Sequence, residues 1–147
     1  MSIALAADTP DTPTAGLSLI RLYAMRATYL IIVIGMAPPM WSAIFHHGTT
    51  WGVMQSAAFC LIGAVTLLAA LGIRYPVRMV PLLLFELAWK AIWLIAVARP
   101  LWSAGLLDAD MMETVKACGL GVILFPLVIP WGHVWANYVR APGDRWR

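Results

Sequence analysis

Charged residues are scarce in this sequence. Asp, Glu, Lys and Arg make up 12% of the 147 residues, about half of their usual share in a soluble domain, whereas hydrophobic residues make up 62%. This composition excludes a soluble globular protein. The ten basic residues give a formal net charge of +3, but they are spread along the chain and do not form one run. This distribution argues against a nucleic-acid partner.

Cysteine and histidine are also rare. The two cysteines, Cys60 and Cys118, belong to different hydrophobic segments and form no C-x-x-C motif, which argues against a disulfide scaffold and against a zinc site. His46 and His47 follow the first hydrophobic segment, and His133 lies near the end of the last one. Because the hydrocarbon core of a bilayer is about 30 Å thick, these histidines cannot share one metal ion. We therefore expect neither a metal nor a cofactor.

Familiar enzymatic motifs are missing as well. The chain contains no H-E-x-x-H, no glycine-rich phosphate loop and no G-x-S-x-G. The connections between the hydrophobic segments are too short to form a catalytic domain outside the membrane. The absence of these motifs argues against an enzyme without excluding one.

Four long hydrophobic segments account for most of the chain. A helix needs about 20 apolar residues to cross the hydrocarbon core, and each segment meets this length. The sequence therefore predicts an all-α protein, a four-helix transmembrane bundle with spans at about 17–45, 51–73, 77–102 and 112–139. The remaining residues are predicted to form a mobile cytoplasmic tail (1–16) and a basic cytoplasmic tail (140–147).

Prolines predict irregularities within these spans. Each proline removes a backbone donor and clashes with the preceding turn of a helix. Pro38 and Pro39 are expected to kink or end the first helix in its last third, and Pro100 to stop the third. Pro126 and Pro130 are four residues apart and predict a bent fourth helix.

Arginines near the segment ends predict the orientation. They fall before the first segment, between the second and third, and after the fourth, at Arg21, Arg74, Arg78, Arg140, Arg145 and Arg147. All of these positions lie on one side of the predicted membrane. The opposite side contains the connections 46–50 and 103–111, of which the second is acidic. The positive-inside rule then predicts that both termini are cytoplasmic, an N-in, C-in topology.

The third segment carries two opposite charges within an apolar run. Glu86 and Lys90 are four residues apart, so they share one face of a helix, with the acid N-terminal to the base, which is the favourable order. A lone charge at this depth costs about 2.5–3.5 kcal/mol on insertion scales. We therefore predict that the two residues pair and face the bundle interior. Trp89 and Trp93 lie beside them at mid-membrane, away from the interfaces where the other aromatic residues fall.

Other polar residues fall at a similar depth. At 1.5 Å per residue, Arg26 of the first segment lies about as deep as Glu86, and we expect the two to pair. The predicted intramembrane polar layer, with its flanking tryptophans, is Arg26, Tyr29, Thr66, Glu86, Trp89, Lys90 and Trp93. Two bases against one acid leave a positive charge, which favours an anionic head group, a quinone-like carbonyl or a carboxylate of a partner. The alternative is a structural ion network that sets the register of the helices.

Three stretches carry a resemblance to known proteins. They are Arg74-Tyr75-Pro76, the run PLLLFELAWK at 81–90 and the run PGDRWR at 142–147. With them, the chain resembles a group of small bacterial four-span membrane proteins that have no assigned activity, and it is similar to DoxX-like proteins in size and topology. The resemblance implies a multi-pass protein of the bacterial inner membrane and no particular activity.

We therefore favour a protein that acts by binding. It would serve as an accessory subunit of a membrane complex, or as a receptor for a lipid-like or quinone-like molecule near Glu86. Its partners would be the lipid bilayer and other membrane subunits or further copies of itself. One alternative is a small oligomeric proton-coupled transporter that titrates Glu86, similar to small multidrug exporters in its number of spans. A second alternative is a membrane thiol redox protein that uses Cys60 and Cys118.

Overall fold

The computed structural model describes residues 17–46 and 51–143, and all regular elements in these ranges are helical. Four helical stretches are long and apolar enough to cross a membrane, which confirms the predicted all-α, four-helix architecture. The elements are α1 (Leu19–Phe45), α2 (Val53–Arg74), α3 (Val80–Trp93), η1 (Leu94–Ala98), α4 (Arg99–Ser103), α5 (Ala109–Val128), α6 (Trp131–Val134) and η2 (Trp135–Arg140). The predicted tail 1–16 and the last residues of the tail 140–147 lie outside the described ranges.

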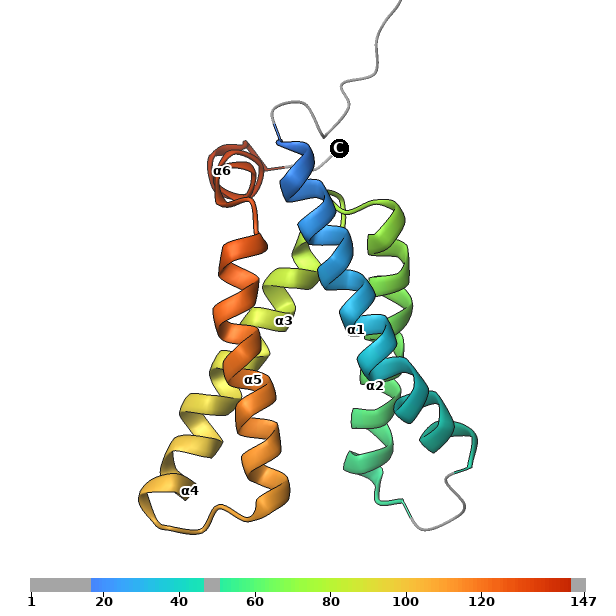
Figure 1. Ribbon diagram of the computed structural model, residues 1–147, viewed down its shortest axis with the longest axis vertical. Helices are drawn as coiled ribbons and strands as arrows, with labels where there is room; N and C mark the ends of the chain where they lie inside the picture. Colours follow the sequence, from blue (N-terminus) through green and yellow to red (C-terminus); the bar gives the residue numbers. More distant parts are fainter. Residues whose placement is uncertain (1–16, 47–50, 144–147) are drawn as a thin grey trace, which may run out of the picture.

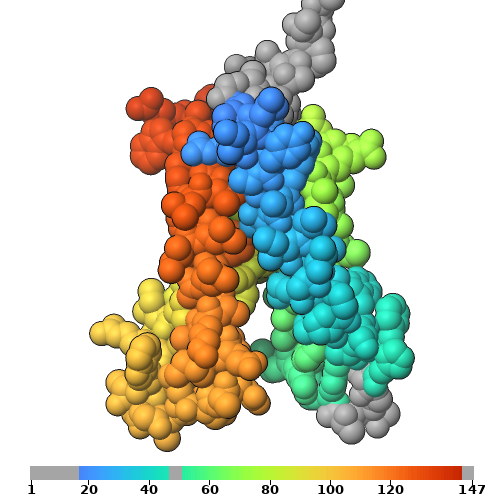
Figure 2. Space-filling model, viewed as in Figure 1, coloured from blue at the N-terminus to red at the C-terminus, as the bar shows by residue number. Residues whose placement is uncertain are grey.

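The helices form two hairpins. α1 packs mainly along α2, and the continuous α3–η1–α4 stretch packs mainly along α5, with fewer contacts between the two hairpins. Figure 1 shows that the hairpins meet where α1 begins and α5 ends, which we call the closed end. They diverge toward the loops after α1 and α4, which we call the open end. Figure 2 shows the space between them there as an open cleft.

The hydrophobic core lies toward the closed end, where the two hairpins are in contact. Its buried members come from α1, α2, α3 and the α5–α6 region: Met25, Tyr29, Ile32, Val65, Ala69, Val80, Leu82, Leu83, Phe125, Val128, Ile129 and Val134. Tyr29 is fully buried, and its hydroxyl donates a hydrogen bond of 3.1 Å to the carbonyl of Pro76 in the α2–α3 turn. Gly72 allows this packing, because a Cβ atom there would lie 2.7 Å from the Tyr29 ring.

Side-chain caps mark the starts of α1 and α5. The Ser18 hydroxyl accepts a hydrogen bond of 3.3 Å from the Arg21 amide, and the Asp108 carboxylate accepts one of 2.7 Å from the Met111 amide. Each cap satisfies an amide that has no partner within its helix. The two helices therefore begin at Leu19 and Ala109, close to the predicted positions.

Proline interrupts the first and third spans less than the sequence suggests. α1 continues through Pro38 and Pro39 to Phe45, so these prolines do not end it. The third span also passes Pro100 and ends at Ser103, which corrects the prediction that Pro100 stops the helix. A π-helical turn precedes this proline, with the Arg99 amide donating to the Leu94 carbonyl. Such a turn changes the hydrogen-bond register locally and lets the helix accommodate the proline.

The fourth span differs most from the prediction. In place of one bent helix over 112–139, α5 ends at Val128, and the following α6–η2 segment runs crosswise at the closed end, where Figure 1 shows it end-on. Pro130 has no amide to donate to the carbonyl of Pro126 four residues earlier. The indole of Trp131 donates to that carbonyl instead, at 2.8 Å. Pro130 therefore separates two helices.

Candidate functional site

Glu86 and Lys90 form the predicted ion pair on α3. Both are buried, with 1% of Glu86 and 9% of Lys90 exposed. The Lys90 ammonium donates to Oε2 of Glu86, and the Trp89 indole donates to the same oxygen at 3.0 Å. All three side chains come from consecutive turns of one helix, so helical geometry alone brings them together.

The Lys90 ammonium also lies against two aromatic rings. Its nitrogen is 4.2 Å from the centroid of the Trp89 ring and 5.2 Å from that of Phe125 on α5. Rings at these distances stabilise a cation that has left water. The stem of Lys90 passes over Gly121 of α5, where a Cβ atom would lie 2.7 Å from Cδ of the lysine. The site therefore links α3 to α5.

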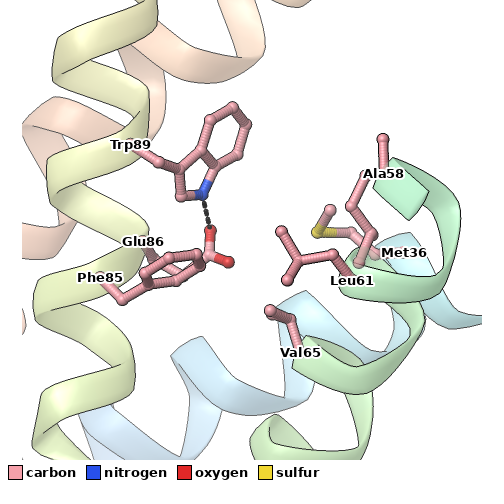
Figure 3. A pocket seen from close by; sticks show the side chains of 8 residues that line it. Met36, Ala58, Leu61, Val65, Phe85, Glu86 and Trp89 are labelled. Atoms are coloured by element: carbon pink, nitrogen blue, oxygen red, sulfur yellow. Dashed lines mark hydrogen bonds between the residues drawn. The ribbon is translucent and has the colours of Figure 1, made fainter. Parts of the chain in front are cut away.

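The second oxygen of Glu86, Oε1, has no hydrogen-bond partner among the described residues, and no described polar side-chain atom is both buried and without a partner. Oε1 therefore keeps a small exposed area, although Glu86 as a whole is buried. Figure 3 shows it directed into the cleft, away from Trp89. The cavity there has a volume of about 210 Å³ and is lined by residues of α1, α2 and α3: Met36, Ala58, Leu61, Ile62, Val65, Phe85, Glu86 and Trp89. A single carboxylate oxygen thus faces an otherwise apolar cavity.

Arg26 does not join this site, which corrects the predicted contact with Glu86. It lies on the exposed side of α1, with its guanidinium carbon 5.7 Å from the centroid of the Tyr23 ring. Within the described ranges, the ion pair of Glu86 is with Lys90. A similar depth in the membrane was not sufficient to predict a contact between Arg26 and Glu86. Met25 and Tyr29 occupy the core-facing side of α1, so Arg26 projects elsewhere.

The remaining predicted residues have other partners. Tyr29 bonds to Pro76, as described above. Thr66 is buried and donates to the Gly63 carbonyl at 2.7 Å, while its oxygen accepts from the Trp41 indole at 3.0 Å. Trp93 is half-buried on the next turn after Trp89 and does not line the cavity. The polar residues therefore form separate contacts, and the surplus positive charge expected beside Glu86 is not there.

The thiol alternative has little geometric support. Cys60 is exposed on α2, whereas Cys118 is buried on α5, and both are free thiols. The two helices belong to different hairpins. No group of three or more His, Cys, Asp or Glu side chains within residues 17–46 and 51–143 could hold a metal ion.

Several residues of the site carry no signal in the sequence. Phe125 and Gly121 reach Lys90 from α5, and Met36, Ala58 and Leu61 line the cavity as ordinary apolar residues of α1 and α2. Glycine within an apolar helix was the one available hint, since it often marks a close approach in membrane proteins.

The fold and the site define a small multi-pass membrane protein with a buried ion pair at the apex of an apolar cleft. No protein-family model, curated protein or solved structure matches the chain. The resemblance to small bacterial four-span proteins and to DoxX-like proteins therefore stays a prediction.

Proposed function

We propose that the protein is a membrane receptor for a lipid-like molecule whose polar head carries a hydrogen-bond donor. The observation that carries this proposal is the free oxygen of Glu86, which faces an apolar cavity of about 210 Å³. Ligand pockets typically combine an apolar lining with a few polar groups that fix the orientation of the ligand. Here the carboxylate would receive the head, and the cavity would take the adjoining part of the chain.

The charge of the site supports a donor over an acceptor. Lys90 neutralises Glu86, and Arg26 lies on the exposed side of α1, where it adds no positive charge to the site. The Lys90 ammonium and the Trp89 indole already donate to Oε2 of Glu86. An anionic head and the carbonyl of an oxidised quinone are themselves hydrogen-bond acceptors. Neither would form a hydrogen bond with Oε1 of Glu86, which is also an acceptor. A hydroxyl, an amine or the hydroxyl of a reduced quinone matches the free oxygen.

A pair of probes tests this proposal on the purified full chain in detergent. We expect a pyrene-labelled decanol to bind about tenfold more tightly than its methyl ether, because the ether has no proton for Glu86. Filling the cavity with Ala58→Trp should weaken binding of the alcohol by at least about tenfold. Pyrene fluorescence measures both effects.

Ala57→Trp is the matched control, since Ala57 is an exposed neighbour on α2 that does not line the cavity. It should bind the alcohol as the parent does. Equal affinities for the alcohol and the ether, or equal effects of the two tryptophans, would contradict the proposal. Co-purification of another subunit or a second copy that blocks the alcohol would favour the accessory-subunit interpretation.

The one-sided opening of the cleft favours a second candidate, a proton-coupled transporter. The core fills the closed end while the cleft opens at the other end, as in one state of an alternating-access cycle. In this interpretation Glu86 would exchange its proton with a substrate. A proton flux into proteoliposomes that depends on Glu86 would favour this candidate over a receptor.

We also propose the bacterial inner membrane as the location, with the closed end cytoplasmic. Arg21, Arg74, Arg78 and Arg140 all lie at the closed end, and Asp108 begins α5 at the open end. Reporter fusions at Arg78 and at the C-terminus should therefore give a cytoplasmic signal, and a fusion at Gly48 a periplasmic one. A cytoplasmic signal from Gly48 would reverse or disrupt this topology.

A further inference from the structure

A second cavity lies at the closed end, between the start of α1 and the crosswise α6–η2 segment. Its volume is about 350 Å³, and it is walled by Arg21 on one side and by His133 and Asn137 on the other. Figures 1 and 2 show the first turns of α1 beside the crosswise segment. The cleft at Glu86 has a carboxylate in an apolar wall, whereas this cavity has a cation, an imidazole and an amide in its wall.

The hydrogen bonds of Asn137 favour one tautomer of the His133 ring. The Asn137 amide nitrogen donates to the His133 carbonyl at 2.9 Å and lies 3.1 Å from Nδ1 of the ring. With Nδ1 as the acceptor, a neutral ring carries its proton on Nε2. Arg21 has no carboxylate partner among residues 17–46 and 51–143. Among the described residues, the wall of the cavity therefore contains a guanidinium without an ion pair and a histidine ring, two groups that donate hydrogen bonds to anions.

A neighbouring cavity extends this one along α1 and α5. It has a volume of about 490 Å³, shares Leu17 and Arg21 with the first cavity, and is otherwise walled by Ser18 and by four apolar residues, Ile20, Ala24, Leu127 and Val128. The two cavities thus adjoin at Arg21, which lines both. An amphiphile would place its anionic head at Arg21 and lay its hydrocarbon chain over the apolar side chains of α1 and α5 in the second cavity.

The crosswise segment has the features of a helix at the membrane surface. Its exposed aromatic side chains are Trp131, Trp135 and Tyr138, each about half exposed. Tryptophan and tyrosine concentrate at the level of the lipid head groups. Val134 of the same segment is buried, which holds the segment against the bundle. The polar cavity therefore lies at the depth where lipid phosphates are found.

We propose that Arg21, His133 and Asn137 form a binding site for the phosphate of an anionic phospholipid, with its acyl chain along α1 and α5. Basic pockets beside membrane helices at an interface bind such head groups. This site is separate from the cleft at Glu86, so its test does not depend on the proposed receptor function.

Native mass spectrometry of the full chain in a neutral detergent tests the site. Dioctanoyl phosphatidylglycerol is the anionic probe, and dioctanoyl phosphatidylcholine is the zwitterionic reference. Arg21→Gln should weaken binding of phosphatidylglycerol by about tenfold or more, because it removes a charge-assisted contact with the phosphate. His133→Phe keeps an aromatic ring but removes the donor, and it should weaken binding by a smaller factor.

Arg78→Gln is the matched control, because it removes the same charge from an exposed residue at the same end, outside both cavities. It should leave phosphatidylglycerol binding within about twofold of the parent. Equal losses from Arg21→Gln and Arg78→Gln would indicate general surface attraction and overturn the site. Displacement of the lipid by millimolar inorganic phosphate would overturn the assignment to a phospholipid, since a free anion would then suffice.

Discussion

Replacement of Glu86 with Gln is expected to lower the free energy of unfolding by about 3–5 kcal/mol. The substitution preserves the shape of the side chain but leaves the Lys90 ammonium buried without a counter-charge. The rings of Trp89 and Phe125 offset part of this loss, since they remain in contact with the cation. Titration of the purified protein with sodium dodecyl sulfate in mixed micelles measures the change.

The double variant Glu86→Gln, Lys90→Met is compared with Glu86→Gln alone, because it removes both charges of the pair. Removal of both charges avoids the stranded cation, so most of the lost stability should return. The double variant should nevertheless reduce the preference for a long-chain alcohol over its ether, because a neutral amide oxygen accepts a hydrogen bond more weakly than a carboxylate does. If Glu86→Gln alone proves as stable as the parent, the pair does not hold the fold together. If the double variant retains the full preference, the negative charge of Glu86 does not contribute to binding of the head group.

Replacement of Gly121 with Ala is expected to lower the free energy of unfolding by about 1–3 kcal/mol, the usual range for overpacking. The added Cβ would lie 2.7 Å from Cδ and 2.9 Å from Cε of Lys90, and 3.2 Å from the Phe125 ring. The lysine stem would have to move away from α5, which disturbs its contact with Glu86. The same micelle titration measures the effect.

Gly119→Ala is the matched control on the same helix, since a Cβ atom there would have no neighbour within 4 Å. It should be neutral or slightly stabilising, because alanine has a higher helix propensity than glycine. Equal effects of the two substitutions would show that Lys90 does not depend on close approach to α5. A loss confined to Gly121→Ala would support the link between the ion pair and the second hairpin.

The fold was predictable because length and hydropathy act locally. A span needs enough consecutive apolar residues to cross the membrane, and its backbone must satisfy its own hydrogen bonds, so helices follow from composition. The exception is the last segment, where apolar character continues beyond Pro130 but the helix does not. Hydropathy alone does not distinguish a bent span from a span followed by a surface helix.

The Glu86–Lys90 pair was predictable for a similar reason. Two residues four apart on one helix are neighbours whatever else the helix contacts. Contacts between helices are different, because they depend on how far each helix is rotated about its axis. Arg26 has a depth suited to Glu86, but each residue turns the helix by about 100°, and Arg26 therefore leaves the face that Met25 presents to the core.

The sequence by itself determined four apolar helices, their order and the buried pair on the third. The tertiary structure decided which helix faces meet, and so which residues accompany that pair. The close approach at Gly121 brings Phe125 of α5 over Lys90, and the packing of two hairpins at one end leaves a cleft beside Glu86 at the other. These features arise from many side chains fitting together across helices, and no single stretch of sequence contains that information.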